Sequence, residues 1–113
     1  MNDKDIPYFK HIMDAIRDIE NSTKNLSRED FENNKDVKDA VIRRIEIIGE
    51  AVKNISKETR NKYHEIEWKK IVGTRDIIIH AYFNVDLDIA WDIVKKDLPK
   101  LKKKIEKILK NNK

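Results

Sequence analysis

Two residues in the stretch RDIIIHAY, residues 75–82, have side chains that could act on a phosphodiester. A neutral imidazole such as that of His80 can take the proton from a ribose 2′-OH near neutral pH. The guanidinium of Arg75 stays charged and can hold a phosphate through two hydrogen bonds, which stabilises charge developing at phosphorus. Such a pair would cleave RNA without a metal ion, leaving a 2′,3′-cyclic phosphate and a free 5′-OH. DNA lacks the 2′-OH and should resist cleavage.

The spacing of this pair does not bring the two side chains together on one ideal helix. Each residue advances the helix by about 100°, so Arg75 and His80 point about 140° apart. Asp76 and His80 are four residues apart and could hydrogen-bond, which would make His80 an ordinary helix residue. Catalysis by the pair requires either a distorted helix after Gly73 or a second copy of the helix across a two-fold axis. A symmetric homodimer would bring both pairs to one cleft.

The other candidate residues give weaker signals. Tyr82 lies within about 20° of the helix face that carries Arg75, but tyrosine is more often a core or interface aromatic than a reactive hydroxyl. His11 and His64 have no clear partner in the sequence and are expected at the surface. No spacing of His, Asp or Glu is typical of a metal site, and no cofactor is expected. Two pairs of acids are interpreted as helix caps or solvated side chains: Asp3 and Asp5, and Asp86 and Asp88.

Length and composition indicate one small helical domain, residues 1–113. The chain is long enough for one modest core, and its charged fraction of 41% with only two glycines and two prolines is typical of an all-helical protein. The absence of cysteine excludes disulfides, a thiolate nucleophile and Cys-ligated zinc. No stretch has the length of a signal-peptide core or a membrane span, so we expect a cytoplasmic protein without a membrane partner.

The formal charge of +4 is unevenly distributed along the chain. Residues 95–113 contain nine lysines against two acids, a balance of +7, so the other 94 residues sum to −3. A basic end of this kind can attract phosphate backbones or anionic lipid. A solvated amphipathic helix is the plainer explanation, because charged and apolar positions alternate there as they do in ordinary bundle helices.

Apolar residues recur at helical spacing almost throughout, which predicts an antiparallel bundle of four or five helices and no strand. A first helix carries an apolar stripe of Phe9, Ile12, Met13, Ile16 and Ile19. A long helix from about Asp36 to Ile55 carries a second stripe of Val41, Ile45, Ile48, Val52 and Ile55. Gly49 lies inside this helix, where it predicts a close approach between two helices.

Short polar segments separate these helices. Ser27 and Asp30 are expected to cap a short helix that runs to about Phe31. A second short turn should start at Ser56, and the next helix should begin near Glu65.

Residues 73–74, Gly-Thr, are poor helix formers and favour a kink in the middle of that helix. Residues 84–86 should interrupt the helix, with Asp86 as the cap of a last helical region. Pro99 should bend that region or restart it from Asp97. Its apolar positions are Ile89, Trp91, Ile93, Val94, Leu98, Leu101, Ile105 and Ile108.

The pattern Arg-x4-His-x-Tyr, carried by Arg75, His80 and Tyr82, resembles the motif of the HepT-like proteins of the HEPN group. Three further stretches agree with this resemblance: DAVIRRIEIIGEAVKNIS around residues 49–51, IEWKKIVGTRD before the arginine, and NVDLDIAWDIV around Trp91. The similarity covers roughly residues 8–109. Several linked motifs in the right order make the resemblance more specific than the Arg–His pair alone.

The resemblance implies a HEPN-like helical bundle that dimerises so that both motifs line one cleft. It implies the toxin of a type VII-like toxin–antitoxin pair, a metal-independent endoribonuclease acting on cellular RNA, with tRNA among the candidate substrates. Arg75 and His80 would be catalytic, and Asp76 would support them. The partner would be a minimal nucleotidyltransferase antitoxin that transfers AMP to Tyr82. Phosphates added beside Arg75 would fill the RNA phosphate site with negative charge.

A second class of function stays open. The chain could be a non-catalytic helical module that docks a nucleotidyltransferase or a nucleotide through the same cleft. The poor helical geometry of the Arg–His pair and the small size of the site favour this alternative. RNA turnover by the purified protein in EDTA would discriminate between the two classes.

Overall fold

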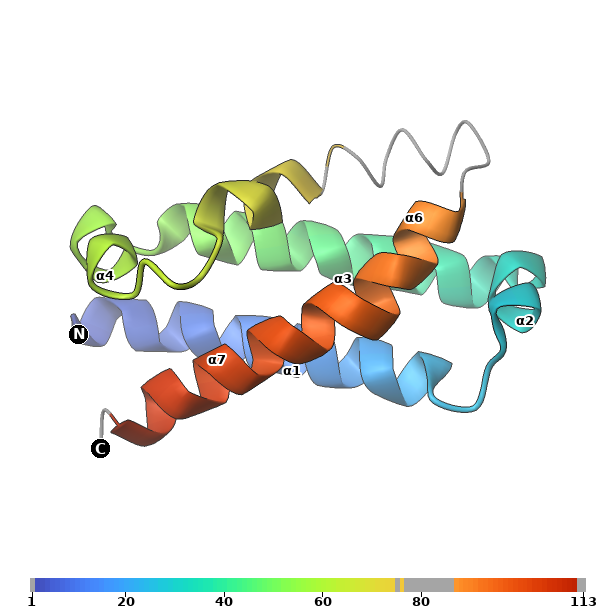
Figure 1. The fold of residues 1–113 in the computed structure, drawn as a ribbon, viewed down its shortest axis with the longest axis horizontal. Helices are drawn as coiled ribbons and strands as arrows, with labels where there is room; N and C mark the ends of the chain where they lie inside the picture. Colours follow the sequence, from blue (N-terminus) through green and yellow to red (C-terminus); the bar gives the residue numbers. More distant parts are fainter. Residues whose placement is uncertain (1, 75, 77–86, 112–113) are drawn as a thin grey trace.

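The structure, a computed structural model, describes residues 2–74, 76 and 87–111 of the chain. Helices joined by short turns make up this part, without a strand, so the all-α prediction is confirmed (Figure 1). Dimerisation stays a prediction. The elements are η1 (Asp3–Asp5), α1 (Ile6–Thr23), α2 (Arg28–Asn33), α3 (Lys35–Asn54), α4 (Lys57–Lys62), a helical segment at 68–74, α6 (Leu87–Asp92), the π-helical η2 (Ile93–Asp97) and α7 (Leu98–Asn111).

The two long helices α1 and α3 lie antiparallel and side by side, and they form the base of the bundle (Figure 1). Both predicted apolar stripes face the core, and every one of their ten residues is buried. Gly49 is also buried on α3. Arg44 of α3 pairs with Asp18 of α1 at 3.6 Å on the surface. Burial of the two stripes therefore supplies most of what holds these helices together, since exposed ion pairs contribute little.

The last helical region crosses α1 and α3 as one continuous rod made of α6, η2 and α7 (Figure 1). In a regular α-helix the ring of Pro99 would clash with the carbonyl of Lys95. Here the backbone N–H of Leu98 bonds to the carbonyl of Ile93, five residues earlier, so the turn before the proline is a π-turn. This wider turn lets the rod continue, and α7 starts at Leu98 with Pro99 in its first turn, which agrees with the predicted restart from Asp97.

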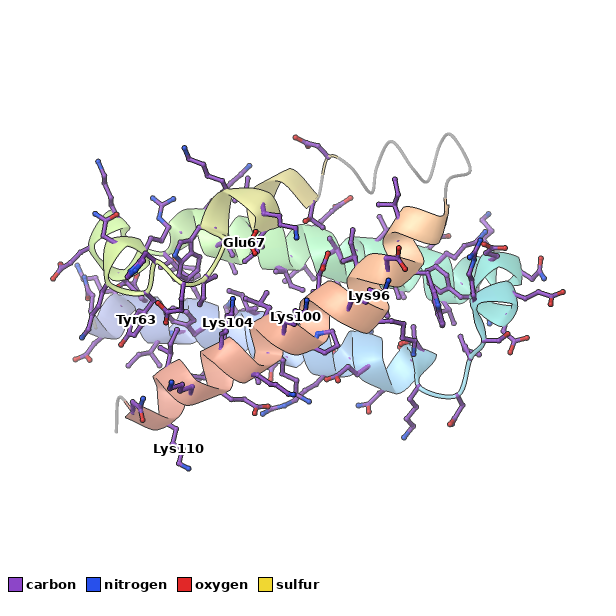
Figure 2. The ribbon with its side chains drawn as sticks, viewed as in Figure 1. Tyr63, Glu67, Lys96, Lys100, Lys104 and Lys110 are labelled. Atoms are coloured by element: carbon purple, nitrogen blue, oxygen red, sulfur yellow. The ribbon has the colours of Figure 1, made fainter. Side chains whose placement is uncertain are left out.

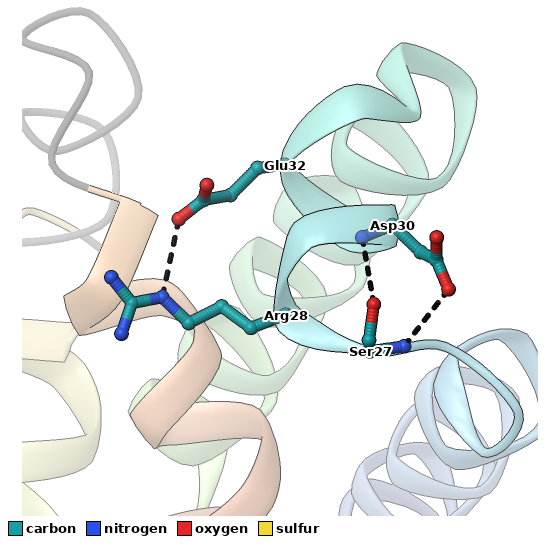
Figure 3. Close-up of polar contacts among 4 residues, drawn as sticks. All are labelled: Ser27, Arg28, Asp30 and Glu32. Atoms are coloured by element: carbon teal, nitrogen blue, oxygen red, sulfur yellow. Dashed lines mark hydrogen bonds and ion pairs between the residues drawn. The ribbon is translucent and has the colours of Figure 1, made fainter.

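The connection between α1 and α3 is built as the sequence predicts. The hydroxyl of Ser27 accepts a hydrogen bond from the backbone N–H of Asp30 at 3.1 Å, and the carboxylate of Asp30 accepts one from the backbone N–H of Ser27 at 3.1 Å (Figure 3). Arg28 and Glu32 add an exposed ion pair at 3.3 Å on the same short helix. This capping box fixes α2 so that Phe31 is buried against the core.

The end of α1 is joined to the C-terminal rod through Lys95. Its ammonium donates to the carbonyl of Thr23 at 3.2 Å and lies 4.7 Å from the ring centre of Trp91. Trp91 in turn packs against Phe31 of α2, with ring centres 5.3 Å apart. A cation at the C-terminal end of α1 satisfies one of its last carbonyls and interacts favourably with the helix dipole.

Two expectations for single residues need correction. Ile89 was placed on the apolar face of the last helical region, but it is 39% exposed, because only one side of α6 faces the bundle. Asp5 was interpreted as a cap or a solvated acid, but it is only 2% exposed. As described below, its carboxylate binds the start of α4, and its own helix receives no side-chain cap from it.

Candidate functional site

The predicted motif lies mostly beyond the part of the chain that the structure describes. Arg75, His80, Tyr82 and the break at residues 84–86 all fall outside it. Asp76 is described, and it is helical and exposed. The exposure of Asp76 leaves its carboxylate accessible to solvent.

The segment that leads into the motif is anchored by Trp68. Its indole N–H is shared between the carbonyl of Arg60 at 3.0 Å and the carbonyl of Tyr63 at 3.1 Å. Its ring is 9% exposed and packs edge-on against Phe9, with ring centres 6.2 Å apart. The helix therefore begins at Trp68, not near Glu65 as predicted. Residues 63–66 form a turn instead, and the carbonyl of Tyr63 in this turn accepts a hydrogen bond from the indole.

From this anchor the helix continues without interruption through residues 68–74. The hydroxyl of Thr74 donates to the carbonyl of Lys70 at 2.8 Å, four residues earlier. This bond within the helix satisfies a hydroxyl that could otherwise compete for the backbone. A side chain at Gly73 would meet nothing within 4 Å, so packing among the residues that the structure describes does not require a glycine there. The kink expected at residues 73–74 stays a prediction.

The start of α4 is held by Asp5, which is 51 residues away in sequence from its first partner. Its carboxylate accepts hydrogen bonds from the backbone N–H of Ser56 at 2.9 Å, from the Ser56 hydroxyl at 2.6 Å and from the Thr59 hydroxyl at 2.6 Å. Burial alone would raise the pKa of Asp5, but these hydrogen bonds outweigh it and lower the pKa below its usual value. Asp5 thus fixes α4, and through α4 the turn that Trp68 anchors.

A narrow cleft of about 110 Å³ lies between α3, residues 66–74 and the C-terminal rod. It runs beneath the helical segment at 68–74, which we call the motif helix because it leads into the motif. Its floor is apolar, with Ile45 and Ile48 from α3. Its rim is charged, and the members are Glu67, Lys70, Asp97, Lys100 and Lys104. In Figure 2, Lys96, Lys100 and Lys104 follow one another along the rod, across from Glu67. The mixed charges of this rim give it no strong preference for an anion.

Several lysines of the basic end are engaged within the fold. Lys104 donates to the backbone carbonyl of Glu65 at 2.9 Å, and Lys102 pairs with Glu20 of α1 at 2.8 Å. Together with Lys95 on Thr23, these contacts tie the rod to its neighbours. Part of the charge concentrated in residues 95–113 therefore has a structural use.

Both remaining histidines behave as predicted. His11 and His64 are exposed. Within residues 2–74, 76 and 87–111, no group of three or more His, Asp or Glu side chains is arranged to hold a metal ion. None of the helices described is both long and apolar enough to cross a membrane.

Sequence reasoning identified the motif but missed the residues that position it. Trp68 was not singled out, and Asp5 was expected only as a cap or a solvated acid. The tryptophan in the first turn of a predicted helix was the available signal, since a buried indole N–H needs an acceptor. Nothing in the sequence near Asp5 could have indicated Ser56 or Thr59 as its partners.

Comparisons with known proteins place most of the chain in one family. The family model described as "Ribonuclease HepT-like" matches residues 12–108. A protein of Methanocaldococcus jannaschii named "Gamma-glutamylcyclotransferase and putative RNase" is 52% identical over 94% of this chain, but the match spans only 50% of that relative's length. A "Probable ribonuclease HepT" of Thermococcus cleftensis is 46% identical over 91% of this chain and 94% of its own length. A second Methanocaldococcus jannaschii protein, named "Putative RNase", is 46% identical over 98% of this chain and 93% of its own length. No solved structure matches the chain significantly.

Proposed function

This chain belongs to the Ribonuclease HepT-like family, and on that premise we propose that it is a metal-independent endoribonuclease, the toxin of a type VII-like toxin–antitoxin pair. The observation that carries the proposal is the family match over residues 12–108, together with full-length relatives named as ribonucleases. The motif Arg-x4-His-x-Tyr adds residue types suited to the chemistry. Cellular RNA in the cytoplasm is the substrate class, with tRNA as one candidate.

In the proposed reaction, His80 is the general base and Arg75 holds the scissile phosphate. The imidazole takes the proton from the 2′-OH, and the 2′-oxygen attacks phosphorus as the bond to the 5′-oxygen breaks. The guanidinium stabilises the negative charge on the phosphoryl oxygens. The departing 5′-oxygen takes a proton from water, and the products are a 2′,3′-cyclic phosphate and a 5′-OH. Asp76, exposed on the helix directly after Arg75, orients the catalytic pair.

Two chains are proposed to share the site. Because Arg75 and His80 point about 140° apart on an ideal helix, one helix does not supply both groups to one phosphate. A two-fold axis beside the motif helix would place the arginine of one chain near the histidine of the other. The homodimer is therefore part of the proposed mechanism.

Regulation is proposed to act on Tyr82. A nucleotidyltransferase partner would transfer AMP to its hydroxyl, which adds negatively charged phosphate close to Arg75. This charge would compete with the RNA phosphate for the guanidinium and exclude the substrate. The modified protein would then be inactive without any change in its fold.

Cleavage of RNA in EDTA tests the proposed function. Purified, unmodified protein should cut RNA in EDTA, and His80→Ala should lose this activity while keeping the helical circular dichroism signal of the parent. Cleavage that persists in His80→Ala would show that His80 is not the base. Tight binding of the nucleotidyltransferase without any RNA turnover would favour a non-catalytic binding module instead.

A further inference from the structure

A second surface next to the motif helix has the charge and shape of a site for a nucleic-acid backbone. It is a groove between α4 and the start of the helical segment at 68–74. We name it the α4 groove, and its lining residues are Lys57, Arg60, Asn61, His64, Glu67, Trp68, Lys69 and Lys70. Four cations face a single carboxylate here, a formal balance of +3 with His64 neutral. The rim of the cleft beneath the helix has three lysines against two acids, a smaller excess of +1.

The cations of the α4 groove are available to a ligand. Among the described residues, none of Lys57, Lys69 and Lys70 forms an ion pair or a side-chain hydrogen bond, and all three are exposed. The carboxylates of Glu58 and Glu65 are close to these lysines in sequence but do not line the groove. The folded chain therefore separates its basic side chains from most of the neighbouring acids.

Arg60 supplies an independent indication of a missing ligand. Within the part of the chain that the structure describes, its Nε is buried and has no hydrogen-bond partner. A buried donor without an acceptor is costly, and a guanidinium N–H is satisfied best by a charged oxygen. Arg60 also lines the α4 groove, so a rotation of its side chain toward an anion there would give this N–H that oxygen.

The groove is fixed relative to the helical segment at 68–74, which leads into the motif. Trp68 hydrogen-bonds to the carbonyl of Arg60, so the residue that carries the unsatisfied donor is tied to the first turn of the motif helix. Thr74, the last residue of this segment before the motif, follows Lys70 by four residues, which is about 6 Å of helical rise. A strand lying in the groove would thus be within a few nucleotides of the motif.

We propose that the α4 groove binds the phosphodiester backbone of the RNA strand whose scissile phosphate lies at the motif. This inference rests on the proposed function and names a substrate-binding surface for it. Single-stranded nucleic acids are commonly held by basic grooves that follow the backbone. The contacts are to phosphates, so the groove contributes affinity and register but reads no base.

An anionic membrane fits the groove less well than RNA does. Peripheral membrane binding requires apolar side chains that enter the bilayer interface beside the basic residues. The large hydrophobic residues exposed in the described part of the chain are Ile47 and Ile89, and neither lines the α4 groove. The one aromatic residue of the groove, Trp68, is buried and bound to backbone carbonyls.

Salt-dependent RNA binding tests the groove separately from cleavage. The protein is the full chain carrying His80→Ala, and the probe is a fluorescein-labelled oligouridylate, followed by anisotropy in EDTA from about 50 to 200 mM KCl. Changing Lys57, Lys69 and Lys70 together to glutamine should lower the slope of log affinity against log salt by about 2, since each phosphate contact in a single strand contributes about 0.7. Arg60→Lys keeps the charge but loses Nε, and it should weaken binding about tenfold.

A charge-matched control uses lysines of α7 that do not line the α4 groove. Lys103, Lys107 and Lys110 are exposed lysines of α7, outside the α4 groove. Changing these three to glutamine removes the same charge and should change the slope by less than about 0.7. The proposal would be overturned if the slope fell equally in the two triple variants, or if it did not change in the groove variant. Parental RNA affinity in Arg60→Lys would also overturn it. The proposal also fails if the groove lysines govern binding to phosphatidylserine vesicles but not to RNA.

Failure of the groove and failure of the proposed function give different results. If the wild-type chain cuts RNA but binding is indifferent to the groove variants, only the groove assignment is wrong. If the groove variants weaken RNA binding but the wild-type chain cuts no RNA, the groove stands and the endoribonuclease assignment fails.

Discussion

Trp68 and Arg60 are joined by a hydrogen bond of 3.0 Å from the indole N–H to the backbone carbonyl. This bond connects two structural features that the sequence separates by eight residues: the start of the motif helix and the short helix α4. Since the carbonyl of Tyr63 shares the same donor, the indole fixes the turn between them. The position of the helical segment at 68–74 relative to α4 therefore depends on one buried side chain.

Trp68→Phe should destabilise the fold by about 1–3 kcal/mol. The substitution leaves the carbonyls of Arg60 and Tyr63 without their donor and removes part of a buried ring. Urea unfolding followed by circular dichroism measures the change. Trp91→Phe serves as the comparison, because Trp91 is a half-buried tryptophan that follows the motif in the sequence. A free energy of unfolding equal to that of the parent would contradict the anchoring role of Trp68.

Asp5→Ala should cost about 2–3 kcal/mol at neutral pH, because the start of α4 loses three hydrogen bonds to a carboxylate. The pKa of Asp5 is lowered by folding, so its contribution is complete above the unfolded value of about 3.9 and is lost as the pH falls through the folded value. The difference between variant and parent should therefore shrink in acid. Asp3→Ala, at an exposed neighbour, should show no such loss. A pH-independent difference for Asp5→Ala would refute this role of the carboxylate.

Lys95→Met should lower stability by about 1 kcal/mol. The variant keeps the length of the side chain but loses the hydrogen bond to the carbonyl of Thr23 and the cation–π contact with Trp91. Lys96→Met is the matched control, because Lys96 makes only an exposed ion pair with Asp92 at 3.7 Å. Denaturant midpoints measure both. Equal effects of the two substitutions would mean that the contacts of Lys95 with Thr23 and Trp91 contribute nothing to the free energy of unfolding.

Protein produced together with its neighbouring nucleotidyltransferase should carry AMP groups, detectable by intact mass. Tyr82→Phe should abolish the added mass, since phenylalanine has no hydroxyl to accept the nucleotide. The modified parent should lose RNA cleavage because its added phosphates compete for Arg75. Modification at another residue, or undiminished cleavage by the modified protein, would contradict the proposed regulation.

The helices could be predicted because their signals are local and repetitive. Each stripe on α1 and α3 repeats an apolar residue every three or four positions, and one face of a helix is enough to specify its burial. The capping box at Ser27 and Asp30 is likewise contained within four residues. Helix ends were less accurate, as at Trp68, because an end depends on which carbonyls need donors in the folded chain.

Long-range relationships could not be predicted in the same way. Asp5 reaches Ser56 only because α1 and α3 fold back on each other, and no periodic pattern records such a pairing. The α4 groove is also hidden in the sequence: residues 57–70 contain five cations and three acids, which look like an ordinary mixture of charges. Folding leaves only Glu67 of those acids in the groove. For the catalytic motif, sequence supplied the residue types, and the convergence of Arg75 and His80 stays a prediction.

The proposed chemistry is tested most sharply by asking whether cleavage needs the 2′-OH at the cut. After the cleaved nucleotide of an RNA has been mapped in EDTA, the same strand is made with one 2′-deoxy substitution at that nucleotide. We predict a 2′,3′-cyclic phosphate and a 5′-OH on the products of the unsubstituted strand, and no cut at the substituted position. Cleavage at the 2′-deoxy position, or products that carry a 5′-phosphate, would contradict an imidazole acting on the ribose hydroxyl.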